Sequence, residues 1–357
     1  MTDGQDTARG DARDDARDDA RDGALPHRSV QIEARVHTVV ERNLRARGWS
    51  PRIFPHTGYA GTTWARVLGR VLLVPPGGPR QAREDGRGWR RFVTTSAGGI
   101  PVTIRIGSET HVVTSGHDGY LDVLLPAELE PGWATALLSV GDAEPVAASL
   151  RVVGPATRLG MVSDVDDTVI QTMLPRPLVA FRNAFLVREN ARRTVSGMAE
   201  LYREIGEAHP DVFVVYLSTG AWNTAPALTS FLTRHDYPPG PLLLTDWGPT
   251  PQGWFRSGQD HKRAQLARLF AELPDLQWLL VGDDGQHDPT LYAEAATAHP
   301  DKVLGIAIRE LSTTEHVVVH GTPVAPTGTE DGIRTPVSAP DGFGLRAGLR
   351  ARGLLPG

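Results

Sequence analysis

The sequence contains no cysteine among its 357 residues. This absence excludes disulfide bonds, a thiolate nucleophile and zinc sites built from cysteine ligands. It is compatible with a reducing compartment, and we expect a cytoplasmic protein whose contact with membranes, if any, is peripheral.

The sequence also lacks a strong charge of one sign and any long hydrophobic run. Its net charge of -5 is mild, so bulk electrostatics give no reason to expect nucleic-acid binding. No apolar run approaches the roughly 20 residues of a membrane-spanning helix, so we expect no transmembrane segment. The N-terminal residues have no apolar stretch of the secretory kind, and we expect no signal peptide.

The first 59 residues divide into a tail and a short ordered part. Residues 1–27 repeat Asp-Ala-Arg-Asp and have little to bury, which predicts a disordered tail. Residues 28–59 are expected to form a helix and a linker. Valine and isoleucine recur at helical spacing over 29–47, and Gly48 is expected to end the helix.

Residues 60–155 show the two-residue alternation of β-strands. Val102, Ile104 and Ile106 alternate with polar residues, and further short apolar runs are separated by glycine, proline, aspartate and serine. This pattern predicts a small all-β, sandwich-like domain.

Residues 156–312 change to apolar strands that alternate with amphipathic helices. This order is typical of a doubly wound parallel sheet covered on both faces. The expected strands are 158–165, 212–219, 240–248, 276–284 and 302–310, and the expected helices are 191–209, 225–235, 261–273 and 289–299. A C-terminal extension, 313–357, should contain a flexible segment and a short helix near 341–352.

Polar side chains gather just past the ends of three of these strands. They are Asp164, Asp166 and Thr168 after the first strand, Ser218 and Thr219 at the end of the second, and Asp283, Asp284 and Asp288 after the fourth. Lys262 opens the expected helix before the fourth strand. Because ligands of doubly wound folds bind at the carboxyl ends of the strands, these groups should converge on one crevice.

Carboxylates this close repel one another, so the cluster needs a positive partner. Oxygen ligands suit a hard cation such as Mg²⁺, and a cation with a lysine would let a carboxylate attack a phosphate ester. Each piece alone has a simpler interpretation. The acidic residues could form a solvated turn or a calcium loop, Ser218 could cap a helix, and Lys262 could be a surface lysine.

Taken together, the segments "DVDDT", "YLSTG", Lys262 and "GDDGQHD" resemble the four motifs of the haloacid dehalogenase (HAD) superfamily. More narrowly, "SDVDDT", "STGAWN", "LLLTDWGP", "WFRSGQDHK" and "GDDGQHDP" are similar to bacterial members of the App1-type phosphatidate phosphatase family. The resemblance covers about 158–312, and the β-rich segment looks like the domain that precedes the catalytic domain in those members. It implies a HAD-like fold without a large cap.

By this resemblance, Asp164 would be the nucleophile and Asp166 the general acid and base. Ser218 would bind a phosphoryl oxygen, Thr168 would support the loop, and Lys262 would stabilise the phosphoaspartate. The pair Asp164 and Asp166 implies a phosphatase or phosphotransferase, because dehalogenases of the superfamily lack the second acid.

The same resemblance implies that Mg²⁺ is held by Asp164, the backbone carbonyl of Asp166, and Asp283. Asp288 has the family spacing for a further ligand, whereas Asp284 stands where many relatives carry serine, so either could support the metal. Thr219 beside Ser218 is a further substrate-binding candidate.

The intervals between the motifs are too short for a large cap domain, so the site should admit a bulky substrate. Trp222, Trp247, Trp254 and Phe255 could contact acyl chains or a membrane surface, or they could pack the edge of the sheet. Arg256 could bind phosphate or pair with an acid. Residues 177–185 could form an apolar flap or part of the core.

The sequence therefore predicts a Mg²⁺-dependent phosphomonoesterase that acts through an aspartyl phosphate, on phosphatidate or a similar lipid phosphate. A HAD-type phosphatase for a soluble metabolite or a phosphoprotein is the alternative. A retired enzyme that works as a binding protein is a third hypothesis, although all the motif residues are present.

Overall fold

The computed structural model describes residues 41–76, 96–171, 193–245, 254–285, 287–312 and 335–356. The expected tail, 1–27, and the possible flap, 177–185, lie outside the described residues. The chain divides into two compact units, residues 1–51 with 73–97 and residues 52–72 with 98–357.

In the first unit, the described residues form a helical segment, a turn and the ends of two strands. Residues 41–46 are helical and a turn at 47–48 follows. Gly48 has a φ of 81°, a left-handed conformation that glycine adopts without strain. Its amide donates to the carbonyl of Arg45 at 2.9 Å. The prediction that Gly48 ends this helix is confirmed for the described part.

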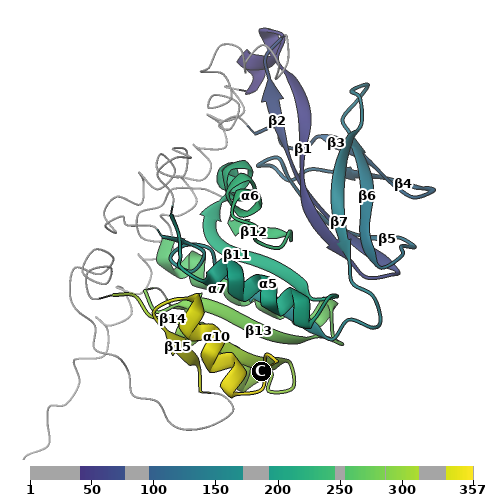
Figure 1. The fold of residues 1–357 in the computed structure, drawn as a ribbon. Coiled ribbons are helices and arrows are strands. Elements are labelled where there is room, and N and C mark those ends of the chain that lie inside the picture. Colours follow the sequence, from purple (N-terminus) through teal and green to yellow (C-terminus); the bar gives the residue numbers. More distant parts are fainter. Residues whose placement is uncertain are drawn as a thin grey trace, which may run out of the picture. The chain divides into compact units, whose positions relative to one another are not determined.

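Seven strands of the described chain form one sheet in the N-terminal half (Figure 1). They are β1 (Ser50–Ala60), β2 (Trp64–Val74), β3 (Pro101–Ile106), β4 (Glu109–Thr114), β5 (Tyr120–Pro126), β6 (Gly132–Ser139) and β7 (Val146–Val152). Their order is β4-β3-β6-β7-β1-β2-β5, and the two edge strands contact each other. The sheet is therefore nearly closed and barrel-like, which corrects the predicted two-sheet sandwich.

The apolar and polar residues whose alternation predicted these strands alternate between buried and exposed positions in the structure. In β3, Val102, Ile104 and Ile106 are buried, whereas Arg105 between them is exposed. Because successive side chains of a strand point to opposite faces, one face of β3 covers the core and the other meets solvent.

Strand β1 lies where a linker was expected, so that expectation is wrong. Pro51 and Pro55 lower the strand signal, because proline cannot donate a ladder hydrogen bond. The strand pairs in parallel with β7 over Gly58–Ala60. Gly58 permits a close approach of β2, since a Cβ there would lie 2.3 Å from the carbonyl oxygen of Arg66.

Six strands of the described C-terminal half form a parallel sheet. They are β8 (Leu159–Ser163), β11 (Phe213–Ala221), β12 (Leu242–Thr245), β13 (Gln277–Asp283), β14 (Val303–Arg309) and β15 (Val337–Ala339). The order is β12-β11-β8-β13-β14-β15 and all the pairs are parallel. In chain order this is 3-2-1-4-5-6, the order of doubly wound folds, as predicted.

Helices connect these strands. They are α5 (Met198–Ala208), α6 (Ala225–Arg234), α7 (Trp254–Glu272), α8 (Asp288–Ala298) and α10 (Gly342–Ala351), with a 3₁₀ turn, η3 (Trp222–Thr224), before α6. Figure 1 shows α5 and α10 side by side on one face of the sheet, and they are in contact. Helices α7 and α8 also contact each other.

Three expectations about this half need correction. Helix α7 begins at Trp254, about two turns before the expected start at 261. Helix α5 begins at Met198 instead of 191, and a short strand pair, β9 (Ile170–Gln171) with β10 (Arg193–Thr194), precedes it. The C-terminal extension contributes β15 to the sheet, although 335–339 was expected to belong to a flexible segment.

Candidate active site

Two neighbouring strands at the centre of the parallel sheet carry the first acidic residues of the site. Strands β8 and β13 pair in parallel, with Ser163 opposite Val281. Asp164 directly follows β8, and Asp283 is the last residue of β13. The strand order reverses between these two strands, and that is where doubly wound folds bind ligands.

Three carboxylates meet at this point. Asp164, Asp283 and Asp288 each place an oxygen within 4.8 Å of the others. Their exposed fractions are 1%, 0% and 0%, so water does not screen their repulsion. Asp288 is the first residue of α8, where the positive end of the helix dipole favours a carboxylate. The predicted convergence of the three is confirmed by their geometry.

Lys262 lies between two of these carboxylates. Its Nζ donates to Asp164 Oδ1 at 2.7 Å and to Asp288 Oδ1 at 2.6 Å, and the side chain is buried. Burial alone would lower the pKa of Lys262, but the two carboxylates outweigh it and raise that pKa above its ordinary value. The lysine is therefore a charged member of the site.

The negative charge of the cluster exceeds the charge of Lys262. Burial raises the pKa of Asp164 to about 7 despite Lys262, and the charges of Asp288 and Asp166 add to the rise. Burial also raises the pKa of Asp283 well above its ordinary value. These shifts mean that the fold holds the carboxylates in a place where ionisation is unfavourable without a further cation.

The cluster has the chemistry of a site for a hard divalent cation. All its donors are carboxylate oxygens, and Asp288 Oδ2 is buried with no hydrogen-bond partner among the described residues. Gly282 leaves room for that oxygen, because a Cβ there would lie 2.6 Å from it. The donors could hold a metal ion.

A second pair of predicted residues lies together beside this cluster. Ser218 Oγ donates to Asp166 Oδ2 at 3.0 Å, and the amide of Gly220 donates to Ser218 Oγ at 2.9 Å. Both side chains are buried. The loop after β8 and the end of β11 therefore hold a carboxyl and a hydroxyl in direct contact.

Thr168 bridges two members of the cluster. Its Oγ1 is 3.4 Å from Asp164 Oδ2 and 3.4 Å from Asp283 Oδ2. The loop reaches this position through Asp167, whose φ of 60° is unusual for a non-glycine residue. Thr168 is therefore placed to orient these two carboxylates, and its expected role in supporting the loop stays a prediction.

The structure gives less direct information on two further residues that were predicted to bind substrate. Thr219 packs against α7, since a Cβ at Gly258 would lie 3.1 Å from Thr219 Cγ2, and its carbonyl accepts from Thr245 Oγ1 at 2.9 Å. Arg256 belongs to α7, but its side chain lies outside the described residues. The expectation that these two bind substrate stays a prediction.

The structure separates the two acids that the sequence could not. Asp288 joins the cluster, whereas Asp284 Oδ1 accepts from the amide of Leu311 at 2.8 Å. The amide of Asp284 donates to the carbonyl of Arg309 at 3.0 Å. Asp284 thus secures the loop after β14, and Asp288 is the better candidate for a metal ligand.

Sequence reasoning missed the buried groups that hold the loop after β8. Ser163 Oγ donates to the carbonyl of Asp164 at 2.6 Å and lies 2.7 Å from Tyr202 Oη. Arg309 Nη1 donates to the carbonyl of Asp167 at 2.8 Å. A serine and an arginine at the ends of otherwise apolar strands were the available signals.

The aromatic residues expected near the site have different positions. Trp222 is 8% exposed and stacks on His56 with ring centroids 4.4 Å apart, and Tyr120 lies 5.8 Å away. Its packing favours the structural interpretation over contact with acyl chains. Trp247 lies outside the described residues, and α7 includes 254–255 without described side chains.

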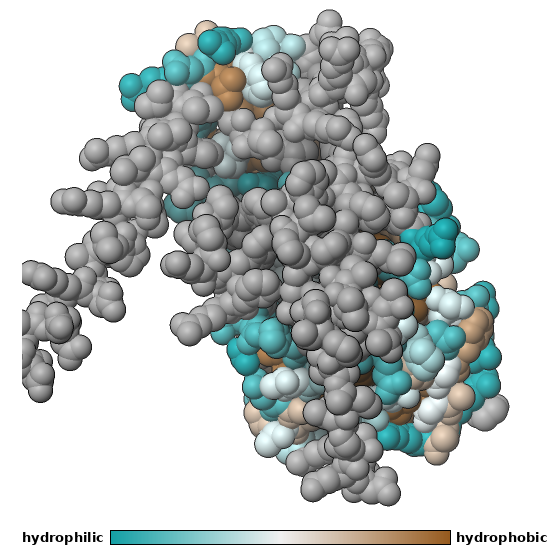
Figure 2. Space-filling model, turned by 90° about the vertical axis from the view of Figure 1, so that its left-hand side faces the viewer, coloured by the Kyte–Doolittle hydropathy of each residue, from teal (hydrophilic) through white to brown (hydrophobic). Residues whose placement is uncertain are grey.

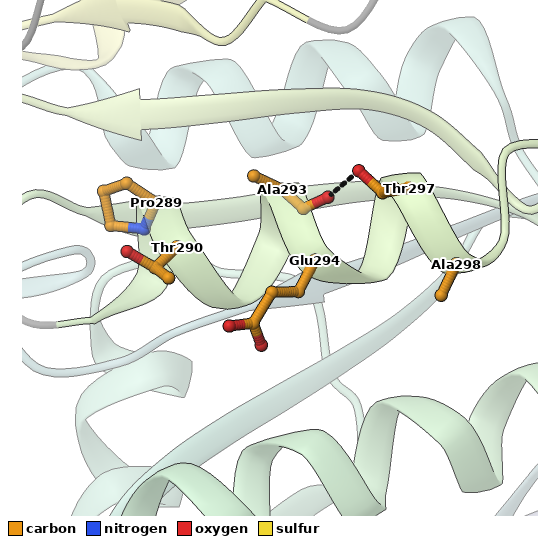
Figure 3. Close-up of a pocket in the computed structure, with 6 residues that line it drawn as sticks. All are labelled: Pro289, Thr290, Ala293, Glu294, Thr297 and Ala298. Atoms are coloured by element: carbon orange, nitrogen blue, oxygen red, sulfur yellow. Dashed lines mark hydrogen bonds between the residues drawn. The ribbon is translucent and has the colours of Figure 1, made fainter.

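A hollow lies on α8 (Figure 3). It is lined by Pro289, Thr290, Ala293, Glu294, Thr297 and Ala298. All of these belong to one helix, whose buried face carries Asp288 instead. The hollow therefore has no part in the chemistry described above.

The described surface shows scattered apolar side chains. The large exposed ones lie on different elements: Val112, Leu124, Trp133, Val146 and Phe343. In the face shown in Figure 2, described hydrophobic and hydrophilic residues are interspersed. Among the described helices, none combines the length and the apolar character that crossing a membrane requires.

Comparison with known proteins identifies the class of this domain. Residues 159–310 match the family described as phosphatidate phosphatase APP1, catalytic domain. These residues hold the parallel sheet from β8 to β14 and every member of the carboxylate cluster. This part of the chain is thus similar to a phosphatase catalytic domain.

Two curated proteins are similar to about half of the chain. Phosphatidate phosphatase APP1 of Saccharomyces cerevisiae is 26% identical over 201 residues, which are 54% of this chain and 34% of that protein. An uncharacterised protein of Schizosaccharomyces pombe is 28% identical over 182 residues, 50% of this chain and 30% of that protein. The chain spans about a third of the length of these relatives. Over residues 159–310 it is similar to the App1-type phosphatidate phosphatase family.

The similarity to solved structures is too weak to identify the fold. A carbohydrate acetylesterase from Xanthomonas citri gives a TM-score of 0.28 at 11% identity, covering 83% of this chain and 72% of the esterase. A structure of PhoD gives a TM-score of 0.30 at 6% identity, covering 72% of this chain and 70% of that one. Neither value establishes a common fold.

Proposed function

We propose that this protein is a phosphomonoesterase of HAD type that requires a divalent cation and acts through an aspartyl phosphate. The observation that carries the proposal is the buried cluster of Asp164, Asp283 and Asp288 with the ammonium of Lys262 between two of them. A site with excess negative charge is suited to bind a cation, and a phosphate ester could then approach it.

In the proposed reaction, a carboxylate oxygen of Asp164 attacks phosphorus while the ester oxygen leaves. Asp166 gives its proton to that oxygen, so the alcohol departs neutral. Water then attacks the phosphoaspartate, Asp166 takes a proton from it, and the products are inorganic phosphate and free Asp164. A carboxyl close to the nucleophile can serve both steps, because its protonation alternates.

The other described residues would bind and orient. Lys262, in contact with Asp164 Oδ1, would balance the charge that develops on the phosphoryl oxygens. Ser218 can exchange its bond to Asp166 for one to a phosphoryl oxygen. Thr168 would hold Asp164 in the attacking position.

Asp164, Asp283 and Asp288 would hold a cation, and Mg²⁺ suits such a set of carboxylates. When bound, it supplies positive charge that offsets the repulsion between two anions. The raised pKa of Asp283 supports this assignment, since it indicates a carboxylate without enough positive charge nearby.

For the substrate, we propose phosphatidate or a similar lipid phosphate. The family match and the name of the yeast relative support a lipid phosphate. The short intervals between the motifs support a site open enough for a bulky ester. A lipid substrate also implies peripheral contact with a membrane surface from a cytoplasmic location.

The test is a phosphate-release assay with the full chain. Phosphatidate in detergent micelles and a panel of soluble phosphomonoesters are each assayed with Mg²⁺ and with a chelator. We expect release from phosphatidate that needs the cation, is lost in Asp164→Asn and persists in Asp284→Asn, the same change at a neighbouring acid outside the cluster. Release from soluble esters alone would remove the lipid proposal. A wild-type protein that hydrolyses none of the esters would favour the binding-protein hypothesis.

A further inference from the structure

A network of charged side chains joins the seven-stranded sheet to helix α7 within the second unit. Arg66 of β2 donates from Nε to Glu272 Oε2 at 3.0 Å and from Nη2 to Glu272 Oε1. Tyr59 Oη donates to Glu272 Oε2 at 2.7 Å. Arg268 of α7 donates to Asp122 Oδ2 of β5 at 2.7 Å, and Arg66 Nη1 donates to the other oxygen of Asp122.

This network is shielded from water more than an ordinary surface ion pair. The side chains of Arg66 and Glu272 are 11% and 15% exposed, and Tyr59 is fully buried. A planar guanidinium that binds both carboxylate oxygens fixes the orientation as well as the distance of its partner. The Glu272 end of α7 is therefore held in one position against β1 and β2.

A second contact joins β1 to η3, and a common core joins the seven-stranded sheet to α7. Trp222, four residues after Ser218, stacks on His56 of β1. Tyr59 and Leu68 belong to one buried cluster with Leu269 and Phe270 of α7. Because protein interiors are close-packed, this arrangement resists small displacements of α7 against the sheet.

Helix α7 connects this anchor to the site. Glu272 is its last residue, and Lys262 lies ten residues earlier, about 15 Å along the helix axis. Arg263, next to Lys262, binds Glu294 of α8 through an exposed pair at 2.9 Å. Lys262 thus lies on a helix that has a shielded anchor at its C-terminal end and an exposed ion pair next to Lys262.

We propose that the seven-stranded sheet is a positioning element of the active site, and that Glu272, held by Arg66 and Tyr59, sets the position of the Lys262 ammonium. This inference rests on the proposed function, because Lys262 must act on the reacting phosphate for its position to matter. Glu272 is a positioning residue, since it acts through Lys262.

The test compares Glu272→Gln with Glu294→Gln in the full chain, with Mg²⁺, on whichever phosphomonoester of the panel above the wild type hydrolyses, phosphatidate in detergent micelles first. Both changes remove one carboxylate that pairs with an arginine, Glu272 from the anchor between α7 and β2 and Glu294 from the surface pair between α7 and α8. We expect Glu272→Gln to lower kcat roughly tenfold with KM nearly unchanged, because misplacing a group that acts in the transition state slows the chemical step. Glu294→Gln should leave both constants within about twofold of wild type.

The choice of assay temperature separates an effect on the stability of the fold from an effect on the position of Lys262. The assays are made well below the melting temperature of each variant, where circular dichroism shows the folded state. A lower melting temperature with unchanged kcat for Glu272→Gln would overturn the inference, because the contact would then only stabilise the fold. A wild-type protein without any phosphomonoesterase activity would overturn the proposed function and the positioning role with it.

Tyr59→Phe provides the second variant if Glu272→Gln does not fold. It removes one hydroxyl that donates to Glu272 and leaves the buried ring in place. We expect a smaller loss, about two- to threefold in kcat with KM unchanged. A kcat equal to that of wild type in folded Tyr59→Phe would overturn the proposal in that case.

Discussion

The two sheets bury charge in different ways. Where the seven-stranded sheet meets α7, Arg66 and Arg268 face Glu272 and Asp122, and the charges are balanced. At the carboxyl edge of the parallel sheet, three buried carboxylates share the ammonium of Lys262.

The difference separates a structural contact from a binding site. Balanced pairs satisfy one another and need nothing from solution, whereas an excess of buried carboxylates raises the free energy of the folded state until a cation arrives. The pKa of Asp164, raised to about 7 by burial, expresses that penalty. The parallel sheet therefore gives up stability at the place where its carboxylates could hold a metal ion.

The largest effect should come from removing the carboxylate that we propose as the nucleophile. We expect Asp164→Asn to lower kcat at least about a thousandfold, because an amide cannot form the acyl phosphate. The melting temperature should stay equal or rise, since one of the repelling carboxylates is gone. Wild-type turnover in this variant would remove Asp164 as the nucleophile.

Replacing Lys262 should increase the excess of negative charge in the carboxylate cluster. We expect Lys262→Met to lower the free energy of unfolding by about 3–5 kcal/mol in metal-free buffer at neutral pH, because Asp164 and Asp288 lose their buried partner. Lys302→Met, at a partly exposed lysine, is the control and should change little. Urea denaturation measures both, and equal losses would show that the cluster needs no lysine for stability.

Adding a cation should reduce the imbalance. Saturating Mg²⁺ should raise the melting temperature of the wild type, with a stabilisation of about 2.7 kcal/mol at a hundred times the dissociation constant. Asp283→Asn should lose most of this shift, whereas Asp284→Asn should keep it, because Asp284 binds the amide of Leu311. Differential scanning fluorimetry checks this without any substrate, and equal shifts in both variants would exclude the cluster as the metal site.

Acid should weaken the contact between β1 and Trp222. Burial, with a smaller contribution from Arg70, lowers the pKa of His56 from 6.5 to about 4. The unfolded chain therefore binds a proton first, so stability should fall as pH drops from about 6.5 to 4 and then level off. We expect His56→Gln to remove roughly 3 kcal/mol of this pH dependence. Urea denaturation at several pH values compares the two, and identical slopes would contradict a buried neutral His56.

Much of the parallel sheet could be predicted because its signals are local. Apolar strands such as β13 and amphipathic helices such as α6 follow directly from residue order. Ligands of doubly wound folds bind at the carboxyl ends of the strands, and this rule predicted that Asp164 and Asp283 lie close together without any knowledge of side-chain contacts.

The strands and site residues that the sequence did not predict depend on contacts with residues that are distant in the sequence. Strand β1 contains Pro51 and Pro55, and it becomes a strand through its place between β7 and β2. Strand β15 is three residues long and gains its role from β14. Arg309 and Tyr202 support the site from elements whose sequence looks like ordinary core or strand end, and tertiary context alone identifies them.

The addition of β15 to the parallel sheet has a practical consequence for fragments of this protein. The family match stops at residue 310, but β15 covers the outer edge of β14, and α10 packs against α5 through buried Leu345 and Leu349. A fragment cut at the family boundary would expose a bare strand edge and an apolar helix face, both of which promote aggregation. Recombinant versions of the catalytic domain should therefore extend through residue 356 to remain monodisperse.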